Sequence, residues 1–478
     1  MKNGYKEEIE NLKKQIFQLK SSNDLDIYEI GLNEELLEKM QNVAKDLLIN
    51  RKKRKIDNVC SVEQWKDFKN TNEFNIHSST IPGVTCITLD VNKYKYNYND
   101  DHMKHNFFSG GNDGNVYYVS LNDNKILSKL QGHLKKVNSI ISHPSNFICI
   151  TASNDKTIRI WKGDDNNVHH NDNGDSDSDN NNNNNDNDGS HLNNNEYIYD
   201  NYQFVSAHVI TKHKDHVTSL ALHPLENYFI SSSKDSMWIL HDLETAKTIK
   251  TSKDNPSSFK HLAIHPDGMM FGIAAQDSNI HIYDIKSQEY KATLNGHTKS
   301  LNCLSFSENG YYLASSSKDN TVKLWDLRKA QSFQTITLNE TPNFISFDYS
   351  GKYLSIAVEN DIQIYNFETK NQANLIKTLS SHTDIVTQTC FGSTTSYILT
   401  SSMDKTIKLW ILIGNNPKKL KSYPSLFIII HICYRFTNFE IYHIYICIYI
   451  YKYIYIWIYI HIHLTFIINN TLIYMWRS

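Results

Sequence analysis

Histidine, serine or threonine, and aspartate recur along this chain in an order that could form the catalytic triad of a hydrolase. In "GHTKSLNCLSFSENGYYLASSSKDNTVKLWDLRK", His297 precedes an apolar run, serines follow, and Asp319 stands six residues before Trp325. The same set recurs elsewhere in the chain, and no copy supplies a distinct nucleophile or oxyanion hole. We therefore predict a structural hydrogen-bonded chain within each repeat, because buried polar groups need partners and a complete network stiffens a fold.

The pattern predicts no catalytic, cofactor-binding or metal-ligating residue. The seven cysteines lie far apart without a C-x-x-C pair, which argues against a disulfide framework or a zinc site and is typical of a reducing compartment. A net charge of −2 gives no general case for binding nucleic acid or a membrane surface, and the N-terminus has no signal peptide. The residues assigned to the structural network are His133, Asp155, Trp161, His213, Asp235, Asp277, His297, Asp319, Trp325, His382, Asp404 and Trp410.

The spacing of the repeats predicts the fold. Each unit of about 40 to 45 residues contains four short β runs, with Gly-His or an equivalent near its start and Trp-Asp or an equivalent at its end, which is the WD-repeat pattern. Seven units predict an all-β, seven-bladed WD-repeat β-propeller over residues 77–410, with a strand near Asn75 to Pro82 completing the last blade. The first and sixth repeats lack parts of the network and are expected to be the softer blades. The turn acids lie at positions 113, 155, 235, 277, 319, 359 and 404.

One interval between turn acids is almost twice the others, and a low-complexity tract accounts for it. Residues 163–196 are rich in Asn, Asp and Ser and almost lack apolar side chains. Such a segment cannot bury enough surface to offset its ordering entropy, so we predict a disordered insertion in the loop between the third and fourth strands of the second blade.

A short helical region precedes the repeats. An a/d stripe in residues 1–22 predicts a coiled-coil oligomerisation segment, and residues 23–76 predict a helical linker with Asn33 as an N-cap. The alternative is that these amphipathic helices pack on their own domain. A basic cluster in the linker is either a nuclear-import signal or a solvated helix end. The stripe is Ile9, Leu12, Ile16 and Leu19, and the cluster is Arg51, Lys52, Lys53, Arg54 and Lys55.

The C-terminal residues 411–478 include a run of alternating isoleucine and tyrosine. A strand of that length would greatly exceed the usual five or six residues, and period-two alternation serves no purpose in a membrane helix. TAT encodes tyrosine and ATA encodes isoleucine, so a TATATA repeat produces this run. We interpret the tail as translated intron or other non-coding sequence, with a membrane anchor or a true β segment as alternatives.

Several stretches resemble one family beyond the generic propeller. "FSENGYYLASSSKDNTVKLWDLRK", "HPDGMMFGIAAQDSNIHIYDIK", "HSSTIPGV" and "GHLKKVNSIISHPS" are similar to the propeller of the pre-mRNA-processing factor nineteen family, the U-box ubiquitin ligases of the spliceosomal nineteen complex. The segment "LEKMQNVAKDLLINRKKRK" resembles the family's stretch between coiled coil and propeller. The U-box that precedes the coiled coil in this family has no counterpart in this chain, so we expect no ligase activity of its own.

The resemblance implies a nuclear scaffold that recruits substrates in pre-mRNA splicing. It implies a homotetramer through the coiled coil, with nineteen-complex and spliceosome proteins as partners. A ubiquitin-conjugating enzyme would be a partner only if the true gene product has a U-box. No cofactor, direct nucleic-acid contact or membrane partner is expected. The alternative is a WD-repeat adaptor protein of another nuclear complex with no enzymatic activity.

Overall fold

The computed structural model describes residues 32–53, 59–78, 80–90, 106–121, 123–165, 202–252, 257–287, 289–369, 372–392 and 395–412. The chain divides into two units after Leu412, and the second unit, Ile413–Ser478, lies outside the described residues. The predicted coiled coil, the interior of the predicted insertion and the Ile/Tyr run also lie outside them. Within the described residues no helix is long and apolar enough to cross a membrane.

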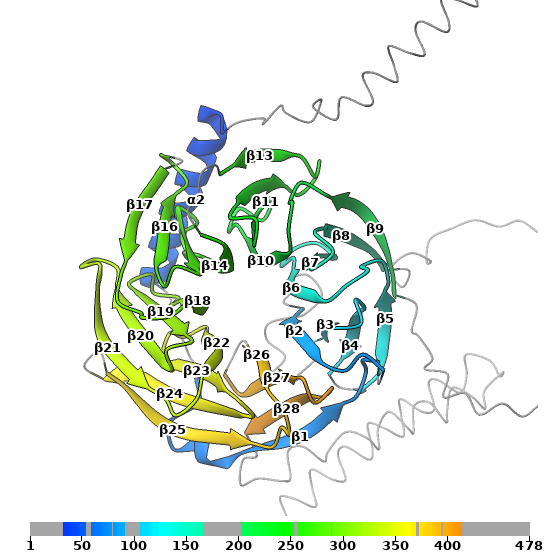
Figure 1. Ribbon diagram of the computed structural model, residues 1–478, viewed down its shortest axis with the longest axis vertical. Coiled ribbons are helices and arrows are strands. Elements are labelled where there is room, and N and C mark those ends of the chain that lie inside the picture. Colours follow the sequence, from blue (N-terminus) through cyan, green and yellow to red (C-terminus); the bar gives the residue numbers. More distant parts are fainter. Residues whose placement is uncertain are drawn as a thin grey trace, which may run out of the picture. The chain divides into compact units, whose positions relative to one another are not determined.

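The described part of the first unit forms seven antiparallel four-stranded sheets, which are the blades of a β-propeller (Figure 1). The seven-bladed WD-repeat fold predicted from the repeat period is therefore confirmed. The first strand of each blade lies innermost in the ring, and the fourth lies at its outer edge.

The strands follow one another in chain order within the first six blades. Blade one contains β2 (Val84–Leu89), β3 (Asn106–Gly111), β4 (Val116–Ser120) and β5 (Ile126–Leu130). Blade two contains β6 (Val137–Ser142), β7 (Ile148–Ser153), β8 (Ile158–Asp165) and β9 (Tyr202–Ile210). Blade three contains β10 (Val217–Leu222), β11 (Tyr228–Ser233), β12 (Trp238–Asp242) and β13 (Thr248–Thr251). Blade four contains β14 (Phe259–Ile264), β15 (Met270–Ala275), β16 (Ile280–Asp284) and β17 (Glu289–Leu294). Blade five contains β18 (Leu301–Phe306), β19 (Tyr312–Ser317), β20 (Thr321–Asp326) and β21 (Gln331–Thr337). Blade six contains β22 (Pro342–Phe347), β23 (Tyr353–Val358), β24 (Asp361–Thr369) and β25 (Gln372–Ser380).

Blade seven closes the ring with a strand from the N-terminal side of the chain. Its inner strands are β26 (Val386–Phe391), β27 (Tyr397–Ser402) and β28 (Ile407–Leu412), and its outer strand is β1 (Phe68–Phe74), antiparallel to β28. The prediction of such a closing strand is confirmed, but its predicted position near Asn75 to Pro82 is wrong. The reason is that His77 in that stretch serves blade one instead.

Three predicted boundaries, at residues 77, 163 and 410, differ from those of the structure. In each case strand pairing extends beyond the residues that carry the repeat signature. The propeller begins with β1, before residue 77. Residues 163–165, assigned to the insertion, belong to β8 and pair with the start of β9. Ile411 and Leu412, assigned to the tail, belong to β28 and pair with Lys69 and Phe68 of β1.

A buried tryptophan seals the seam between blades six and seven. Trp65 lies in the short helix η1 (Gln64–Asp67) and is fully buried. Its ring stacks on Phe68 at 4.1 Å between centroids and meets the rings of Tyr353 and Phe391 edge-on at 5.2 and 6.2 Å. The Cys60 carbonyl accepts a hydrogen bond from the Tyr353 hydroxyl, so the segment before β1 is part of the propeller core.

Helix α2 (Glu34–Lys53) packs on the propeller. It begins after Asn33, whose Oδ1 accepts the Leu36 N–H at 2.8 Å, as the N-cap prediction requires. Met40 is fully buried in a core cluster with Ile230 of blade three and Phe271 of blade four. The alternative in which this amphipathic helix packs on its own domain is therefore the one that the structure shows.

Candidate functional site

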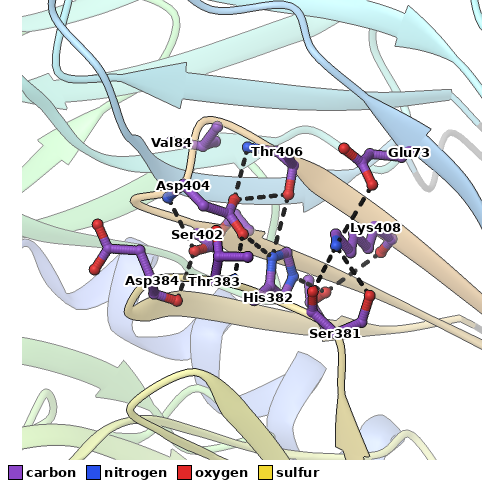
Figure 2. Close-up of polar contacts among 12 residues, drawn as sticks. Glu73, Val84, Ser381, His382, Thr383, Asp384, Ser402, Asp404, Thr406 and Lys408 are labelled. Carbon is purple, nitrogen blue, oxygen red and sulfur yellow. Dashed lines mark hydrogen bonds and ion pairs between the residues drawn. The ribbon is translucent and has the colours of Figure 1, made fainter.

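The blade network is complete in blades two, five and seven. In blade seven, His382 Nδ1 lies 2.8 Å from Asp404 Oδ2, and His382 Nε2 lies 2.8 Å from Thr400 Oγ1 (Figure 2 shows the His382–Asp404 pair). The Trp410 indole N–H donates to the same Thr400 oxygen at 3.0 Å. The Thr400 hydroxyl then donates to His382 Nε2, and His382 Nδ1–H donates to the Asp404 carboxylate. One neutral histidine therefore satisfies the whole hydrogen-bonded chain.

The same geometry recurs in blades two and five. The histidine to aspartate distance is 2.9 Å in both, and the histidine to hydroxyl distance is 2.8 Å in both. The tryptophan N–H donates to the hydroxyl at 2.8 Å in each. The hydroxyls are Thr151 and Ser315, which join His133, Asp155, Trp161, His297, Asp319 and Trp325.

Blade three replaces tryptophan with histidine and keeps the network. His213 lies 3.0 Å from Asp235 and 2.9 Å from Ser231 Oγ, and His241 Nε2 lies 2.8 Å from the same hydroxyl. His241 Nε2–H therefore donates where the indole N–H donates in the other blades. Complete burial lowers the pKa of His241 well below its usual value, so the ring stays neutral.

Blade one has more of the network than its sequence predicts. His77 Nδ1 lies 3.2 Å from Asp113 Oδ1, and His77 Nε2 lies 3.0 Å from Ser109 Oγ. The spacing hides this pair, because 36 residues separate His77 from Asp113 while 22 separate the pair in blades two, three, five and seven. Residues 91–105, between β2 and β3, account for the difference. Only the tryptophan position, occupied by Val119, departs from the pattern.

Blades four and six depart most from the network. Asp277 contacts His281 of the neighbouring strand at 3.0 Å, and Ile273 occupies the hydroxyl position. In blade six, Ser355 bonds Thr389 of blade seven at 2.7 Å, and Glu359 stands in place of the turn aspartate. The sequence correctly predicts that the network of blade six is incomplete. Asp277 was predicted to belong to the hydrogen-bonded network of blade four, but it pairs with His281 instead.

A second set of histidines links neighbouring blades and was missed by sequence. His143, His223 and His265 stand at the turns between the first and second strands of blades two, three and four. Each Nε2 bonds a turn carbonyl of the next blade, at 3.2 Å to Glu226, 3.0 Å to Gly268 and 2.8 Å to Gly310. The dipeptide "HP", repeated at these three turns, is the signal that could have found them.

The ring closure is held by polar side chains as well as by strand pairing. Lys408 of β28 is almost fully buried and donates to the carbonyl and hydroxyl oxygens of Ser381 at 2.8 and 2.9 Å. Its Nζ lies 3.4 Å from the Glu73 carboxylate of β1 (Figure 2). Thr71 Oγ1 donates to the Leu409 carbonyl at 3.1 Å, so β1 is fixed in register against blade seven.

The network carboxylates are held ionised. Burial raises the pKa of Asp404, but hydrogen bonds from His382 and Thr406 hold it well below its usual range. At Asp319, Asp113 and Asp155 hydrogen bonds likewise outweigh burial. They lower the pKa of Asp319 to about 2 and the pKa values of Asp113 and Asp155 well below the usual range. These groups are therefore acceptors at every physiological pH and are not poised for proton transfer.

Buried histidines predict that acid weakens the fold in two stages. Burial lowers the pKa of His223 from 6.5 to about 4, so its contribution is complete above pH 6.5 and declines as pH falls toward 4. The lowered aspartate pKa values add a second loss below about pH 4. We expect His223→Gln to reduce the slope of the unfolding free energy against pH in the first stage, by up to about 1.4 kcal/mol per pH unit. Urea unfolding at a series of pH values measures both stages, and a flat unfolding free energy between pH 6.5 and 4 would contradict them.

The described residues contain no group of three or more His, Cys, Asp or Glu side chains that could hold a metal ion. The predicted basic cluster is only partly described. The Arg51 guanidinium lies beside Gly310. Burial raises the pKa of Asp267, but the hydrogen bond from His265 and, to a smaller extent, the charge of Arg51 bring it below its usual value. Lys53 is exposed. The side chain of Lys52 and the residues Arg54 and Lys55 lie outside the described part of the chain.

This ring of blades with recurring His–Ser/Thr–Asp–Trp networks is a WD-repeat propeller. The family model for the WD domain, G-beta repeat, matches residues 124–162, 204–242, 288–326 and 373–410. Each match spans the fourth strand of one blade and the first three strands of the next. Sequence repeats and blades are therefore offset by one strand, and β1 supplies the fourth strand that the last repeat leaves out of blade seven.

The chain belongs to the pre-mRNA-processing factor 19 family. It is 31% identical over 396 residues to pre-mRNA-processing factor 19 of Mus musculus, an alignment that covers 80% of this chain and 67% of that relative. It is 30% identical over 392 residues to pre-mRNA-processing factor 19 homolog 2 of Arabidopsis thaliana, covering 80% and 65%. A shorter match, 47% over 53 residues, is to the WD repeat domain-containing protein 83 homolog of Dictyostelium discoideum, covering 11% and 16%.

Proposed function

We propose that this protein is a scaffold and substrate-recruiting subunit of the spliceosomal nineteen complex that acts in pre-mRNA splicing. The observation that carries the proposal is the similarity to pre-mRNA-processing factor 19 over 80% of the chain. The relatives' name refers to pre-mRNA processing, and that process takes place in the nucleus, so we propose a nuclear location.

The structure supports a binding role for the propeller. The network carboxylates, such as Asp404 and Asp319, have lowered pKa values and are fixed as acceptors instead of being poised as acids. Closure by β1 and the docked helix α2 make the ring a rigid platform. Rigid platforms carry their binding groups on loops and turns, which vary without cost to the core.

We propose that residues 1–22 assemble the scaffold as a homotetramer through Ile9, Leu12, Ile16 and Leu19. The nuclear-import role of Arg51 to Lys55 is proposed on charge alone, and the packing of Arg51 against the propeller leaves Lys53 as the exposed described member. In this family the ubiquitin-conjugating enzyme is a partner of the U-box. We therefore propose that any contribution to ubiquitin transfer by residues 32–412 is substrate recruitment.

Affinity purification of the tagged full-length chain from cells tests this function. We expect small nuclear RNAs and splicing proteins in the eluate, and unspliced introns to accumulate when the protein is depleted. The double variant Leu12→Asp/Ile16→Asp should abolish the tetramer in analytical ultracentrifugation and release complex proteins, because charges at a/d positions destroy the helical seam. Gln15→Asp/Gln18→Asp, which lies off the stripe, is the matched control. Recovery of another nuclear complex without splicing proteins would favour the adaptor alternative.

A further inference from the structure

Four lysines from four neighbouring blades lie at one end of the propeller. Lys136 precedes β6, Lys260 is the second residue of β14, and Lys234 and Lys318 stand in the turns between the second and third strands of blades three and five. In an antiparallel blade, the loop before the first strand and the turn after the second strand lie at the same end. Backbone bonds of 2.9 Å from Lys234 N–H to His216 O and 3.0 Å from Lys318 N–H to Ser300 O join these loops and turns. We call these four side chains the lysine rim.

Two members of the lysine rim stand beside the axis of the ring. Lys136 and Lys260 lie next to or on the innermost strands β6 and β14 (Figure 1). Asn138, two residues after Lys136, donates to the Val217 carbonyl of blade three at 2.7 Å, so the innermost strands β6 and β10 of adjacent blades are in contact here. Lys234 and Lys318 are exposed, and Lys136 and Lys260 are partly buried.

The ammonium groups repel one another and have no acidic partner among the described residues. Burial, and then the charges of Lys318, Lys234 and Lys136, lower the pKa of Lys260. No ion pair within 4.0 Å joins any rim lysine to a described carboxylate. The nearby network acids, such as Asp155 and Asp319, are bound to their histidines and backbone N–H groups. Asp215 accepts the His216 N–H at 2.7 Å. The positive charge of the rim is therefore left for an external anion.

We propose that the lysine rim binds an acidic peptide segment of a partner protein, with carboxylates meeting the four ammonium groups. Single-stranded RNA is less suited, because such sites stack bases on aromatic side chains. The large aromatic side chains exposed in the described residues are Tyr290, Tyr311, Phe333 and Tyr349. They lie on outer strands or in turns at the opposite end of the blades. The rim also lacks arginine, the residue that holds phosphate groups bidentately.

Fluorescence anisotropy with a labelled oligoglutamate peptide and the purified full-length chain tests the proposal. We expect binding that weakens with added salt, and Lys234→Ala/Lys318→Ala should weaken it about tenfold. Both positions are exposed, so the variant should fold normally, which its thermal unfolding checks. Lys69→Ala/Lys329→Ala makes the same change of net charge on β1 and in a turn at the other end of blade five, and should bind like the wild type.

Three outcomes would overturn the proposal. The first is unchanged peptide binding by the rim variant, and the second is an equal loss in the control variant, which would indicate attraction by net charge alone. The third is tighter binding of a labelled oligouridine than of oligoglutamate, lost in the same rim variant, which would assign the rim to RNA. The result is independent of the proposed function, because the purified chain is measured without any splicing component.

Discussion

Replacing Trp65 with alanine is expected to lower the free energy of unfolding by about 3 to 5 kcal/mol, the cost of emptying a large aromatic site in a core. Trp65 is fully buried and touches Phe68 of the closing strand, Tyr353 of blade six and Phe391 of blade seven. Its loss therefore weakens both the seam between two blades and the attachment of β1. Urea unfolding of the full-length protein, followed by tryptophan fluorescence and circular dichroism, measures the effect.

Two further variants make this prediction specific. The Trp65 indole N–H has no hydrogen-bond partner among the described residues, so its contribution comes from packing. Trp65→Phe should then lose less than about 1.5 kcal/mol, because it keeps most of the aromatic volume. Tyr349→Ala removes an aromatic ring that is 54% exposed and should change stability by less than about 0.5 kcal/mol. A loss at Trp65→Ala no larger than that at Tyr349→Ala would show that the seam does not hold the ring.

The repeat signature predicts the blades but not their closure. His133, His213, His297 and His382 each precede their aspartate by 22 residues, and this regularity carries the fold prediction. The closing strand has no such signal. Its sequence "FKNTNEF" is apolar only at its ends, because an outer strand leaves most of its side chains in solvent. Trp65 is equally hidden, since a single aromatic residue in a polar linker has no period to reveal its burial.

Contacts between blades were also beyond reach of the repeat pattern. A repeat marks residues that several units share, such as His223 in its HP turn, but it does not show which neighbouring blade the side chain bonds. It also does not show that lysines of other blades help to lower the pKa of Lys260. His77 was missed because residues 91–105 break the spacing within blade one. The lysine rim combines four loops and strands that are far apart in sequence, and only the ring brings them together. The sequence therefore predicts the blades better than it predicts groups that are assembled from several blades.

Replacing Asp404 with alanine should cost about 3 kcal/mol, and replacing Asp277 with alanine about 1 kcal/mol, because the two aspartates occupy the same turn position in networks of different completeness. Asp404 accepts from His382 and from the Thr383 N–H, the Thr406 N–H and the Thr406 hydroxyl, at 2.6 to 3.0 Å. Its side chain and that of His382 are 5% and 0% exposed, so the variant leaves buried donors without acceptors. Asp277, at 28% exposure, accepts from His281 and Asn279, and water can replace it.

Comparing Asp404→Ala with Asp277→Ala separates the stability contributed by the network from that contributed by the turn hydrogen bond. Both aspartates accept the N–H two residues ahead, so equal losses in the two alanine variants would mean that only this turn bond matters. Asp404→Asn keeps one acceptor oxygen but places an amide against its donors, and we expect a loss between those of the two alanine variants. Asp404→Ala should also reduce the steepness of acid unfolding below about pH 4, because a carboxylate with a strongly lowered pKa has been removed. Asp277→Ala provides the reference slope for that measurement. A larger loss at Asp404 together with the shallower acid slope would identify the His–Thr–Asp–Trp chain, and not the tight turn alone, as what makes blade seven rigid enough to hold β1.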